Sequence, residues 1–492
     1  MDKHTAVILV AVLITVTVLP SLQTFGSDSS DAASLSDLER YDAKVSPFTF
    51  PESKGSPVLK ALSEADTSVD VSMYYLTSDN AVGILCKLVG NGVTVRVLVD
   101  NSPVAVSTDK EFQMLKKLDD LGGDVRLICT KGHTEDRYEN VHNKYAVIDG
   151  DTVVVTSENW TASNFSSSGN RGWGVVVQST EYASYMTTVF ESDFDDSNAD
   201  VDHIEDAVTV TAYSGTMSEK VPSYTFTWYD AQVSPVTSPD NSFSAQEALM
   251  ASAQTRLYAE QLDLSSSYLT TTGSTPIAWM SARADAGVDV RLVLNASYDS
   301  EGTGAYKDVE YVNDNTNIRA AAISGGSGFT VTHNKGIVAD DKVWVGSVNW
   351  TPTSFNSNRE CAVVIYSQVV SDYYAGYFET DFNNNYTDLD AVSWKVHYVV
   401  DGVDTVVRVT KGAQITLPET PTKESTWLYT YTFSHWEGYT DGMTADGETT
   451  FTAVFDQSLN LTVIIGAAVV VLAVLLKVFL GAGRKKKRRS RR

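Results

Sequence analysis

Two short segments of this 492-residue chain carry the same chemically capable residues at the same spacing. Both have the pattern H-x-K-x-x-x-x-D, and the residues at the three named positions are His142, Lys144 and Asp149 in one copy and His333, Lys335 and Asp340 in the other. Both continue into S-x-N-W-T, which adds the further candidates Ser157, Asn159, Ser347 and Asn349. The copies also share the asparagine between histidine and lysine, so coincidence is a poor explanation. We predict two half-sites.

A histidine and a lysine two residues apart project from the same face of a β-strand. A pocket on that face would receive an imidazole and an ammonium together, which suits a phosphate group. The lysine can neutralise anionic oxygens, while the histidine acts as a nucleophile or transfers a proton. The expected chemistry is therefore that of a phosphate ester.

The residues of the S-x-N-W-T segments have two interpretations. A strand returning from a turn would bring Ser157 and Asn159 in one copy, or Ser347 and Asn349 in the other, towards the same phosphate oxygens as hydrogen-bond donors. Alternatively, these polar side chains cap loops while the tryptophans pack beneath them. We favour phosphate binding for the asparagines and packing for the tryptophans.

The aspartates of the two motifs occupy a different position. Asp149 lies five residues after Lys144, so the two have opposite strand parity, and it opens an Asp-Gly pair that is typical of a hairpin turn. Asp340 followed by Asp341 repeats the arrangement. We count both aspartates among the catalytic candidates, and we expect them to shape the site more than to react in it.

The composition indicates a folded, acidic protein. Hydrophobic residues make up 43% of the chain and charged residues 20%, which excludes wholesale disorder. The formal net charge of -25 disfavours a broad electrostatic contact with nucleic acid. Three cysteines, Cys86, Cys129 and Cys361, are too few for a disulfide framework and lack metal-ligand spacing. We expect buried thiols, with a Cys86–Cys129 bridge as the alternative.

The first 40 residues are expected to direct export. A short, mostly apolar run follows Lys3, so residues 1–26 are interpreted as a signal peptide or, alternatively, an uncleaved signal anchor. Residues 27–40 form a linker rich in serine and aspartate.

A tandem repeat fills the middle of the chain. YDAKVSPFTFPES from Tyr41 recurs as YDAQVSPVTSPDN from Tyr229, and FESDF from Phe190 recurs as FETDF from Phe378. Repeats of this length indicate a duplicated domain and not a solenoid. The predicted units are a first half at residues 41–198, a linker at 199–228 and a second half at 229–391.

Both halves are predicted to be α/β structures. In the first half, the β-branched runs VDVSMYYL, VTVRVLVD and DVRLICT alternate with helical patterns near residues 80–89 and 110–121. This alternation is typical of βαβ units, in which a largely parallel or mixed sheet is covered on both faces.

The pattern changes to alternating strands with Asp-Gly turns at residues 392–456. This segment, DGVDTVVRVTKGAQITLPETPTKE followed by YTFSHWEGY and TFTAVF, resembles the small β-grasp-like repeats of internalin-type bacterial surface proteins. The resemblance implies a spacer or adhesion module.

The C-terminal region predicts a membrane anchor. Residues 461–480 are apolar enough to cross a bilayer, with only Lys477 able to extend towards the interface. The basic tail at residues 484–492 would stay in the cytoplasm by the positive-inside rule, with the preceding chain outside. We predict a single-pass cell-membrane protein whose catalytic region is extracellular.

The doubled H-x-K-x-x-x-x-D motif with its trailing S-x-N-W resembles the phospholipase D superfamily over about residues 41–385. The resemblance implies two tandem α/β halves around a pseudo-twofold cleft in which both motifs meet. It implies a phosphohistidine mechanism, with His142 as nucleophile and His333 as acid and base. Lys144, Lys335, Asn159 and Asn349 would hold the phosphoryl oxygens, so neither a metal ion nor a cofactor is required.

One feature departs from the family pattern. An acidic residue usually follows the Asn-Trp pair and orients a histidine. The second half has it as Glu360 in NRECAVVI, which we count among the catalytic candidates, but the first half reads NRGWGVVV with Gly172 at that position. Glu158 or a backbone carbonyl could substitute, and the sequence does not indicate which histidine Glu360 serves.

These observations favour a membrane-anchored phosphodiesterase that acts on phospholipid head groups, by hydrolysis or by transfer to an alcohol. Two alternatives stay open: a secreted or surface nuclease of the same superfamily, and a non-catalytic adhesion protein on a degenerate fold. No obligate protein partner is predicted. His133 lies near His142 on a polar segment and is interpreted as a solvated loop residue.

Overall fold

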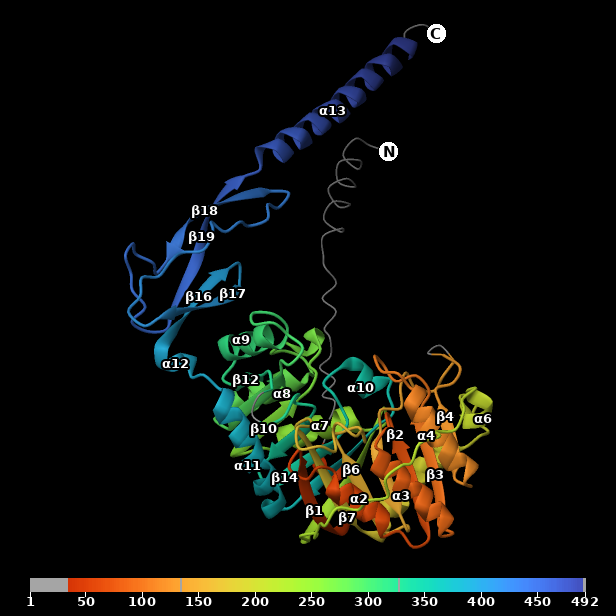
Figure 1. Ribbon diagram of the computed structural model, residues 1–492. Helices are drawn as coiled ribbons and strands as arrows, with labels where there is room; N and C mark the ends of the chain where they lie inside the picture. The colour runs from red at the N-terminus through yellow and green to blue at the C-terminus, as the bar shows by residue number, and fades with distance from the viewer. Residues whose placement is uncertain (1–33, 133–134, 326–327, 490–492) are drawn as a thin grey trace.

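The computed structural model describes residues 34–132, 135–325 and 328–489. The predicted signal segment at residues 1–26, the first part of the linker, His133 and the last residues of the basic tail lie outside the described residues. The described chain forms an α/β region, a small β-module and a long C-terminal helix (Figure 1).

The α/β region repeats one order of elements. In half 1, defined as residues 41–198, these are β1 (Tyr41–Phe50), α2 (Ser56–Ser63), β2 (Ser68–Met73), α3 (Asp79–Gly90), β3 (Thr94–Asp100), α4 (Asp109–Asp120), β4 (Asp124–Ile128), β5 (Lys144–Ile148), β6 (Thr152–Thr156), β7 (Gly172–Gln178) and α5 (Thr180–Phe194). In half 2, defined as residues 229–391, they are β9 (Tyr229–Ser238), α7 (Ser242–Ala251), β10 (Arg256–Gln261), α8 (Pro276–Asp285), β11 (Asp289–Asn295), α9 (Ala305–Asn315), β12 (Arg319–Ile323), β13 (Lys335–Ala339), β14 (Lys342–Gly346), α10 (Pro352–Asn356), β15 (Glu360–Tyr366), α11 (Gln368–Asn385) and α12 (Leu389–Val392).

The strands of both halves belong to one continuous sheet. Among the described residues it has 15 strands, in the order β12-β11-β10-β13-β14-β15-β9-β1-β7-β6-β5-β2-β3-β4-β8, where β8 is Val201–His203. The antiparallel pair β1–β9 joins the halves and aligns Ala43 with Ala231, which occupy the same position in the sequence repeat. A pseudo-twofold axis therefore passes through this pair. The prediction of two α/β halves is confirmed, and the structure adds that they share one sheet.

The apolar runs become strands that are buried on both faces. In β3, Val95, Val97 and Val99 pack towards α2, α3 and α4, whereas Leu98 belongs to the cluster on the opposite face. Alternate side chains of a strand point to opposite faces, so a strand covered on both sides needs a nearly continuous apolar run. Parallel pairing of β2, β3 and β4 confirms the predicted βαβ units.

The two faces of the sheet are covered differently. On one face α5 and α11 join strands of both halves in a single buried cluster, to which Phe190 and Phe378 contribute. On the other face each half has its own cluster, formed by α2, α3 and α4 in half 1 and by α7, α8 and α9 in half 2. Since α5 also contacts β9 and α11 contacts β1, the halves are packed together as well as hydrogen-bonded.

The predicted linker at residues 199–228 is packed onto half 1. It begins with β8 and α6 (Ile204–Ala207), and β8 extends the sheet beside β4. Further along, Met217 is buried, and a Cβ at Gly83 of α3 would overlap the carbonyl of Ser218. The connection therefore forms part of the half 1 surface and its core.

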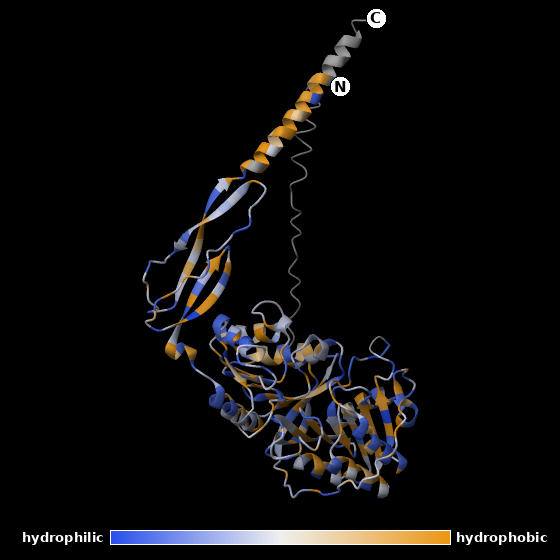
Figure 2. Ribbon diagram, turned by 45° about the horizontal axis from the view of Figure 1, so that its top comes forward, coloured by the Kyte–Doolittle hydropathy of each residue, from blue (hydrophilic) through white to orange (hydrophobic). Residues whose placement is uncertain are grey.

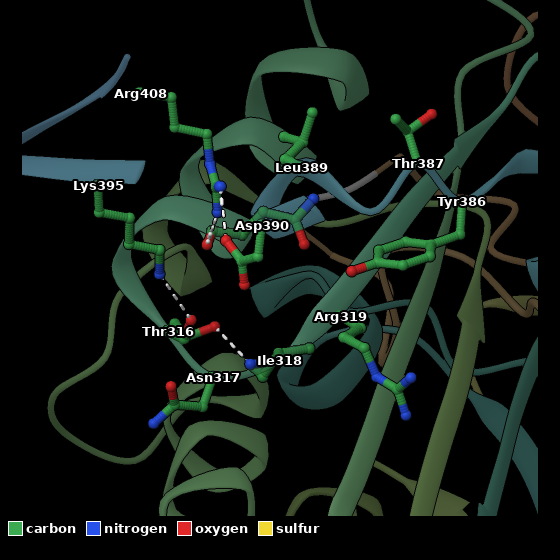
Figure 3. Close-up of a pocket in the computed structure, with 11 residues that line it drawn as sticks. Thr316, Asn317, Ile318, Arg319, Tyr386, Thr387, Leu389, Asp390, Lys395 and Arg408 are labelled. Atoms are coloured by element: carbon green, nitrogen blue, oxygen red, sulfur yellow. Dashed lines mark hydrogen bonds and ion pairs between the residues drawn. The ribbon is translucent and has the colours of Figure 1, made fainter. Parts of the chain in front are cut away.

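The β-module has the four predicted strands, β16 (Ser393–Val400), β17 (Val403–Thr410), β18 (Tyr429–Glu437) and β19 (Thr449–Leu459), in the order β17-β16-β19-β18. Arg408 of β17 joins it to half 2, with Nε 2.5 Å from Asp314 Oδ1 and NH1 2.6 Å from Asp390 Oδ1. Lys395 donates to the Thr316 carbonyl at 3.4 Å. Figure 3 shows the pocket at this junction, which measures about 250 Å³ and is not lined by any H-x-K residue.

Helix α13 (Leu461–Arg489) continues from β19 and projects away from the rest of the molecule (Figures 1 and 2). Its segment Val463–Leu480 has a mean hydropathy of 3.0 and is not buried against other described residues. By length and composition this is the one described helix able to cross a membrane, and it matches the span predicted at residues 461–480.

The three cysteines form no disulfide. Cys129 and Cys361 are buried thiols as predicted, whereas Cys86 is only half-buried. The alternative Cys86–Cys129 bridge is absent.

Candidate active site

The two H-x-K segments are held by backbone contacts with the opposite half. His142 N donates to the carbonyl of Arg359 at 2.8 Å, and His333 N donates to the carbonyl of Arg171 at 2.9 Å. The lysines that follow, Lys144 and Lys335, are the first residues of β5 and β13. His142 thus lies just before β5 of its own half and beside the start of β15 of the other half. His333 lies in the same way before β13 and beside the start of β7.

Buried ion pairs fix this crossing. Arg171 Nε lies 2.6 Å from Asp381 Oδ2 on α11, and Arg359 Nε lies 2.8 Å from Asp193 Oδ2 on α5. Each arginine therefore reaches the C-terminal helix of the other half. The sequence analysis assigned no role to these residues, although the FESDF and FETDF repeats contain both aspartates and the NR dipeptides contain both arginines.

His142 is paired with Glu360 of half 2. The distance from His142 Nδ1 to Glu360 Oε2 is 2.7 Å, and Glu360 is fully buried. Burial opposes ionisation of Glu360, but its contacts with His142, the charge of Lys144 and a 2.6 Å hydrogen bond from Ser347 Oγ lower its pKa below the ordinary value. An ionised carboxylate accepts a hydrogen bond from Nδ1–H, which keeps the proton on Nδ1 and leaves the Nε2 lone pair free.

His142 also has an aromatic neighbour that the sequence analysis missed. The Tyr74 ring stands edge-on to the imidazole with centroids 4.7 Å apart, and Lys144 Nζ lies 5.1 Å from the centre of the same ring. Burial lowers the pKa of His142 to about 4, against the opposing effect of Glu360. This histidine is therefore neutral at neutral pH. Tyr74 lies within the predicted strand VDVSMYYL and directly follows β2, but its counterpart in half 2 is Leu262, so the repeat offered no signal.

His333 has a different set of neighbours. Its Nδ1 lies 3.1 Å from the Ser157 carbonyl and 3.2 Å from Glu158 Oε1, both in half 1, and 3.2 Å from Lys335 Nζ of its own half. Burial and the charge of Lys335 lower the pKa of His333, while Glu158 opposes the shift. Glu360 serves His142, and both substitutes considered from the sequence, Glu158 and a backbone carbonyl, stand beside His333.

The two lysines are buried cations. Lys144 Nζ donates to the carbonyl of His142 at 2.8 Å, and Lys335 Nζ donates to that of His333 at 2.5 Å. Neither ammonium has an ion pair with a carboxylate among the described residues. Burial lowers the pKa of Lys144 to about 7 and that of Lys335 to about 8. Each lysine also depresses the pKa of the histidine in the opposite half, so the four groups share one electrostatic environment.

The asparagines and serines of the trailing segments differ in their hydrogen bonding. Asn159 and Asn349 each have a buried side-chain amide oxygen without a partner among the described residues. The serines are engaged in the scaffold instead: Ser157 Oγ accepts from Trp173 N at 3.0 Å, and Ser347 Oγ donates to Glu360. These free oxygens are acceptors, so a phosphate would have to be held by the Nδ2 donors of the asparagines, whereas the predicted phosphate contact of Ser157 and Ser347 competes with the bonds to the scaffold.

Asp149 and Asp340 lie at the opposite ends of their strands from the lysines. Asp149 accepts hydrogen bonds from three successive backbone amides, those of Asp66, Thr67 and Ser68, at 2.7 to 2.9 Å. Asp340 holds the amides of residues 254–256 in the same way, and both aspartates have a positive φ. They therefore tie a hairpin turn to the start of β2 or β10, and their inclusion among catalytic candidates is not supported by this placement.

Within the described part of the chain, no group of three histidine, cysteine or acidic side chains could hold a metal ion. The available site chemistry is that of two imidazoles, two ammoniums and two carboxylates. These groups can perform nucleophilic attack, proton transfer and charge neutralisation at a phosphate.

This fold and site define a class of protein. The family model "Cardiolipin synthase, PLD-like domain" matches residues 58–194 and 248–382, which is more than half of the chain. The chain belongs to this family of PLD-like domains. No curated protein sequence matches the chain.

Three solved structures are similar to parts of the chain, and the first supports the fold. A phosphatidylserine synthase from Haemophilus influenzae Rd KW20 aligns with a TM-score of 0.52 at 13% identity, over 72% of this chain and 90% of that protein. Nuc, a phospholipase D family member from Salmonella typhimurium, aligns with a TM-score of 0.28 at 18% identity, over 34% of this chain and 98% of that protein. A polyphosphate kinase from Porphyromonas gingivalis reaches 0.44 at 9% identity, over 69% of this chain and 50% of that protein.

Proposed function

We propose that this protein is a membrane-anchored phosphodiesterase that hydrolyses the head-group phosphodiester of phospholipids through a phosphohistidine. The observation that carries the proposal is the crossed arrangement of the site. Each half supplies the carboxylate that faces Nδ1 of the other half's histidine, and two buried lysines stand beside them without carboxylate partners among the described residues. Such a site is built for an anion that must be attacked and protonated.

The proposed first step begins at His142. With its Nδ1 proton held by Glu360, Nε2 forms a bond to phosphorus while the bond from phosphorus to the head-group oxygen breaks. His333 gives the departing oxygen a proton from Nε2. The bound phosphate anion raises the pKa of His333 relative to the free protein, because a nearby opposite charge favours the imidazolium.

In the second step His333 takes a proton from water, and the water oxygen attacks phosphorus. The phosphorus–nitrogen bond breaks and its electron pair returns to Nε2 of His142, which restores the starting state. Lys144, Lys335, Asn159 and Asn349 hold the phosphoryl oxygens throughout. An alcohol in place of water would give transfer of the phosphatidyl group.

The apolar helix α13 supports a lipid substrate. Helix α13 would anchor the protein, with the α/β region outside the cell and the basic tail in the cytoplasm. The β-module, similar to internalin-type repeats in sequence, would act as a spacer between the two. The net charge of -25 weighs against a polyanionic nucleic acid as the substrate.

The decisive experiment offers the purified protein both substrates. Phosphatidylcholine and phosphatidylethanolamine vesicles should release their head groups, and single-stranded DNA should stay intact. His142→Ala should abolish release, and wild-type protein quenched in denaturant at alkaline pH should carry a phosphatidyl group on histidine. DNA cleavage without head-group release would reject the lipid substrate, and full activity of His142→Ala would reject the mechanism.

A further inference from the structure

We infer that Glu158 is the positioning residue of His333, and that the lack of a side chain at Gly172 leaves room for the Glu158 carboxylate. This inference rests on the proposed function and extends it to the second histidine. In half 2 the orienting carboxylate comes from the first residue of β15, Glu360. In half 1 the equivalent first residue of β7 is Gly172, and the carboxylate comes instead from the turn after β6.

The carboxylate occupies opposite members of one pair of equivalent positions in the two halves. Half 1 has Glu158 in the turn and Gly172 on the strand, whereas half 2 has Val348 in the turn and Glu360 on the strand. A Cβ added at Gly172 would overlap the carboxylate of Glu158. A glycine is therefore required at residue 172 because Glu158 occupies the space that a side chain would need. The backbone conformation does not require it, since the φ of Gly172 lies outside the left-handed range.

The same amide clamp holds the carboxylate in both halves. Asn358 Nδ2 donates to Glu360 Oε1 at 3.0 Å, and its counterpart Asn170 donates to Glu158 Oε2 at 3.2 Å. In each case the second carboxylate oxygen faces Nδ1 of the histidine in the opposite half. Two carboxylates that enter from different backbone positions thus reach equivalent places, and both are fully buried.

The two histidines are nevertheless held unequally. Glu360 lies 2.7 Å from its histidine, whereas Glu158 lies 3.2 Å from His333 and shares Nδ1 with the Ser157 carbonyl and with Lys335 Nζ, which is also 3.2 Å away. The carbonyl can hold the proton on Nδ1, while the Lys335 ammonium beside the same nitrogen disfavours it, so Glu158 acts mainly through its charge. The other charged groups facing His333 are Lys335 and Lys144, which favour the neutral imidazole. Glu158 is the counter-charge that keeps His333 able to carry a proton as an acid.

The test uses full-length protein in lipid nanodiscs, labelled with ¹⁵N-histidine. Glu158→Gln keeps the shape and removes the charge, so the pKa of His333 should fall while its Nδ1–H tautomer persists. We expect kcat/KM for head-group release to drop about 10- to 100-fold. On the alkaline side of the pH profile, the activity should begin to fall at a lower pH than in the wild type. Because the chain has seven histidines, a His333→Asn variant assigns the signal.

Two further variants separate positioning from a general loss of structure. Glu360→Gln should disturb the tautomer and titration of His142 and leave those of His333 in place. Glu158→Val combined with Gly172→Glu copies the half 2 arrangement, and it should recover most of the activity that Glu158→Val alone loses.

An unchanged His333 titration in Glu158→Gln would overturn the inference, as would a double variant no more active than Glu158→Val. If the wild-type protein releases no head group, the proposed function fails. The histidine titrations still decide the role of Glu158 in that case.

Discussion

Lys144 and Lys335 are fully buried, which is costly for two cations that have no carboxylate partner among the described residues. Burial lowers the pKa of Lys144 to about 7 and that of Lys335 to about 8. Near neutral pH the two lysines of the free protein are therefore only partly protonated. An anion in the site would restore both charges. At the scale of the residue, the site is therefore organised for a ligand that brings negative charge.

This arrangement predicts the pH dependence of anion binding. Above about pH 8 both lysines of the free protein are neutral and must regain protons when an anion binds. The affinity for tungstate, which keeps its charge over this range, should then fall about tenfold per pH unit for each lysine that is reprotonated. Isothermal titration calorimetry between pH 6 and pH 9.5 measures the slope.

Matched variants identify the groups responsible. Lys144→Gln should weaken binding and reduce the slope by one proton, whereas Lys342→Gln, at the first residue of β14 where the ammonium pairs with Asp341, should change neither. The histidines add little to this slope because their pKa values are lowered, that of His142 to about 4. An affinity that is constant with pH would contradict the burial argument.

At the scale of the element, the two halves pack together because a large residue of one half meets a small residue of the other across the pseudo-twofold axis. Trp173 of β7 is fully buried against Tyr374 of α11, with ring centroids 4.7 Å apart, and it covers Gly336 of β13. The positions equivalent to Trp173 and Gly336 hold Cys361 and Tyr145. A large residue therefore meets a small one on each side, which supports contact between unlike halves.

This packing predicts a large effect from one methyl group. A Cβ at residue 336 would overlap the Trp173 ring, so Gly336→Ala should lower the free energy of unfolding by about 1–3 kcal/mol. Gly376→Ala is the matched control, because that glycine lies within α11 with open space around it. The control should raise stability by about 0.5–1 kcal/mol. Urea unfolding followed by tryptophan fluorescence measures both, and a Gly336→Ala protein as stable as wild type would contradict the fit.

At the scale of the whole molecule, the β-module lies between the α/β region and α13 (Figure 1). Arg408 and Lys395 fix the module against half 2, so the catalytic region and the apolar helix are joined through a folded spacer. The helix is the only described segment of its kind and packs against nothing else described. Membrane attachment and catalysis should therefore be separable.

Truncation tests this separation. A chain that starts at residue 34 behind an unrelated cleaved export signal and ends at Leu459 should appear in the soluble fraction, with unchanged activity on a monomeric short-chain phospholipid. A chain that starts in the same way and ends at Arg484, which lacks only the basic residues beyond it, should remain with the membranes. Membrane fractionation followed by the activity assay distinguishes the two. A truncated protein that stays bound to membranes would show that another surface anchors it.

Local patterns predicted most of the fold. The βαβ units, the four strands of the module and the apolar helix follow from side-chain periodicity and length, which depend on neighbouring residues. The repeat also predicted the two halves. It did not predict the single sheet, because hydrogen bonding between β1 and β9, one strand from each half, leaves no signal in hydropathy.

The sequence by itself determined which residue types are present: two H-N-K segments, two trailing asparagines and one carboxylate, Glu360, at the family position. Only the tertiary structure decided that Glu360 faces His142 and that Glu158 faces His333. The reason is that these partners lie 218 and 175 positions apart and meet only when the two halves pack across their axis. Both halves carry nearly the same local pattern, so nothing short of their packing could assign each carboxylate to its histidine.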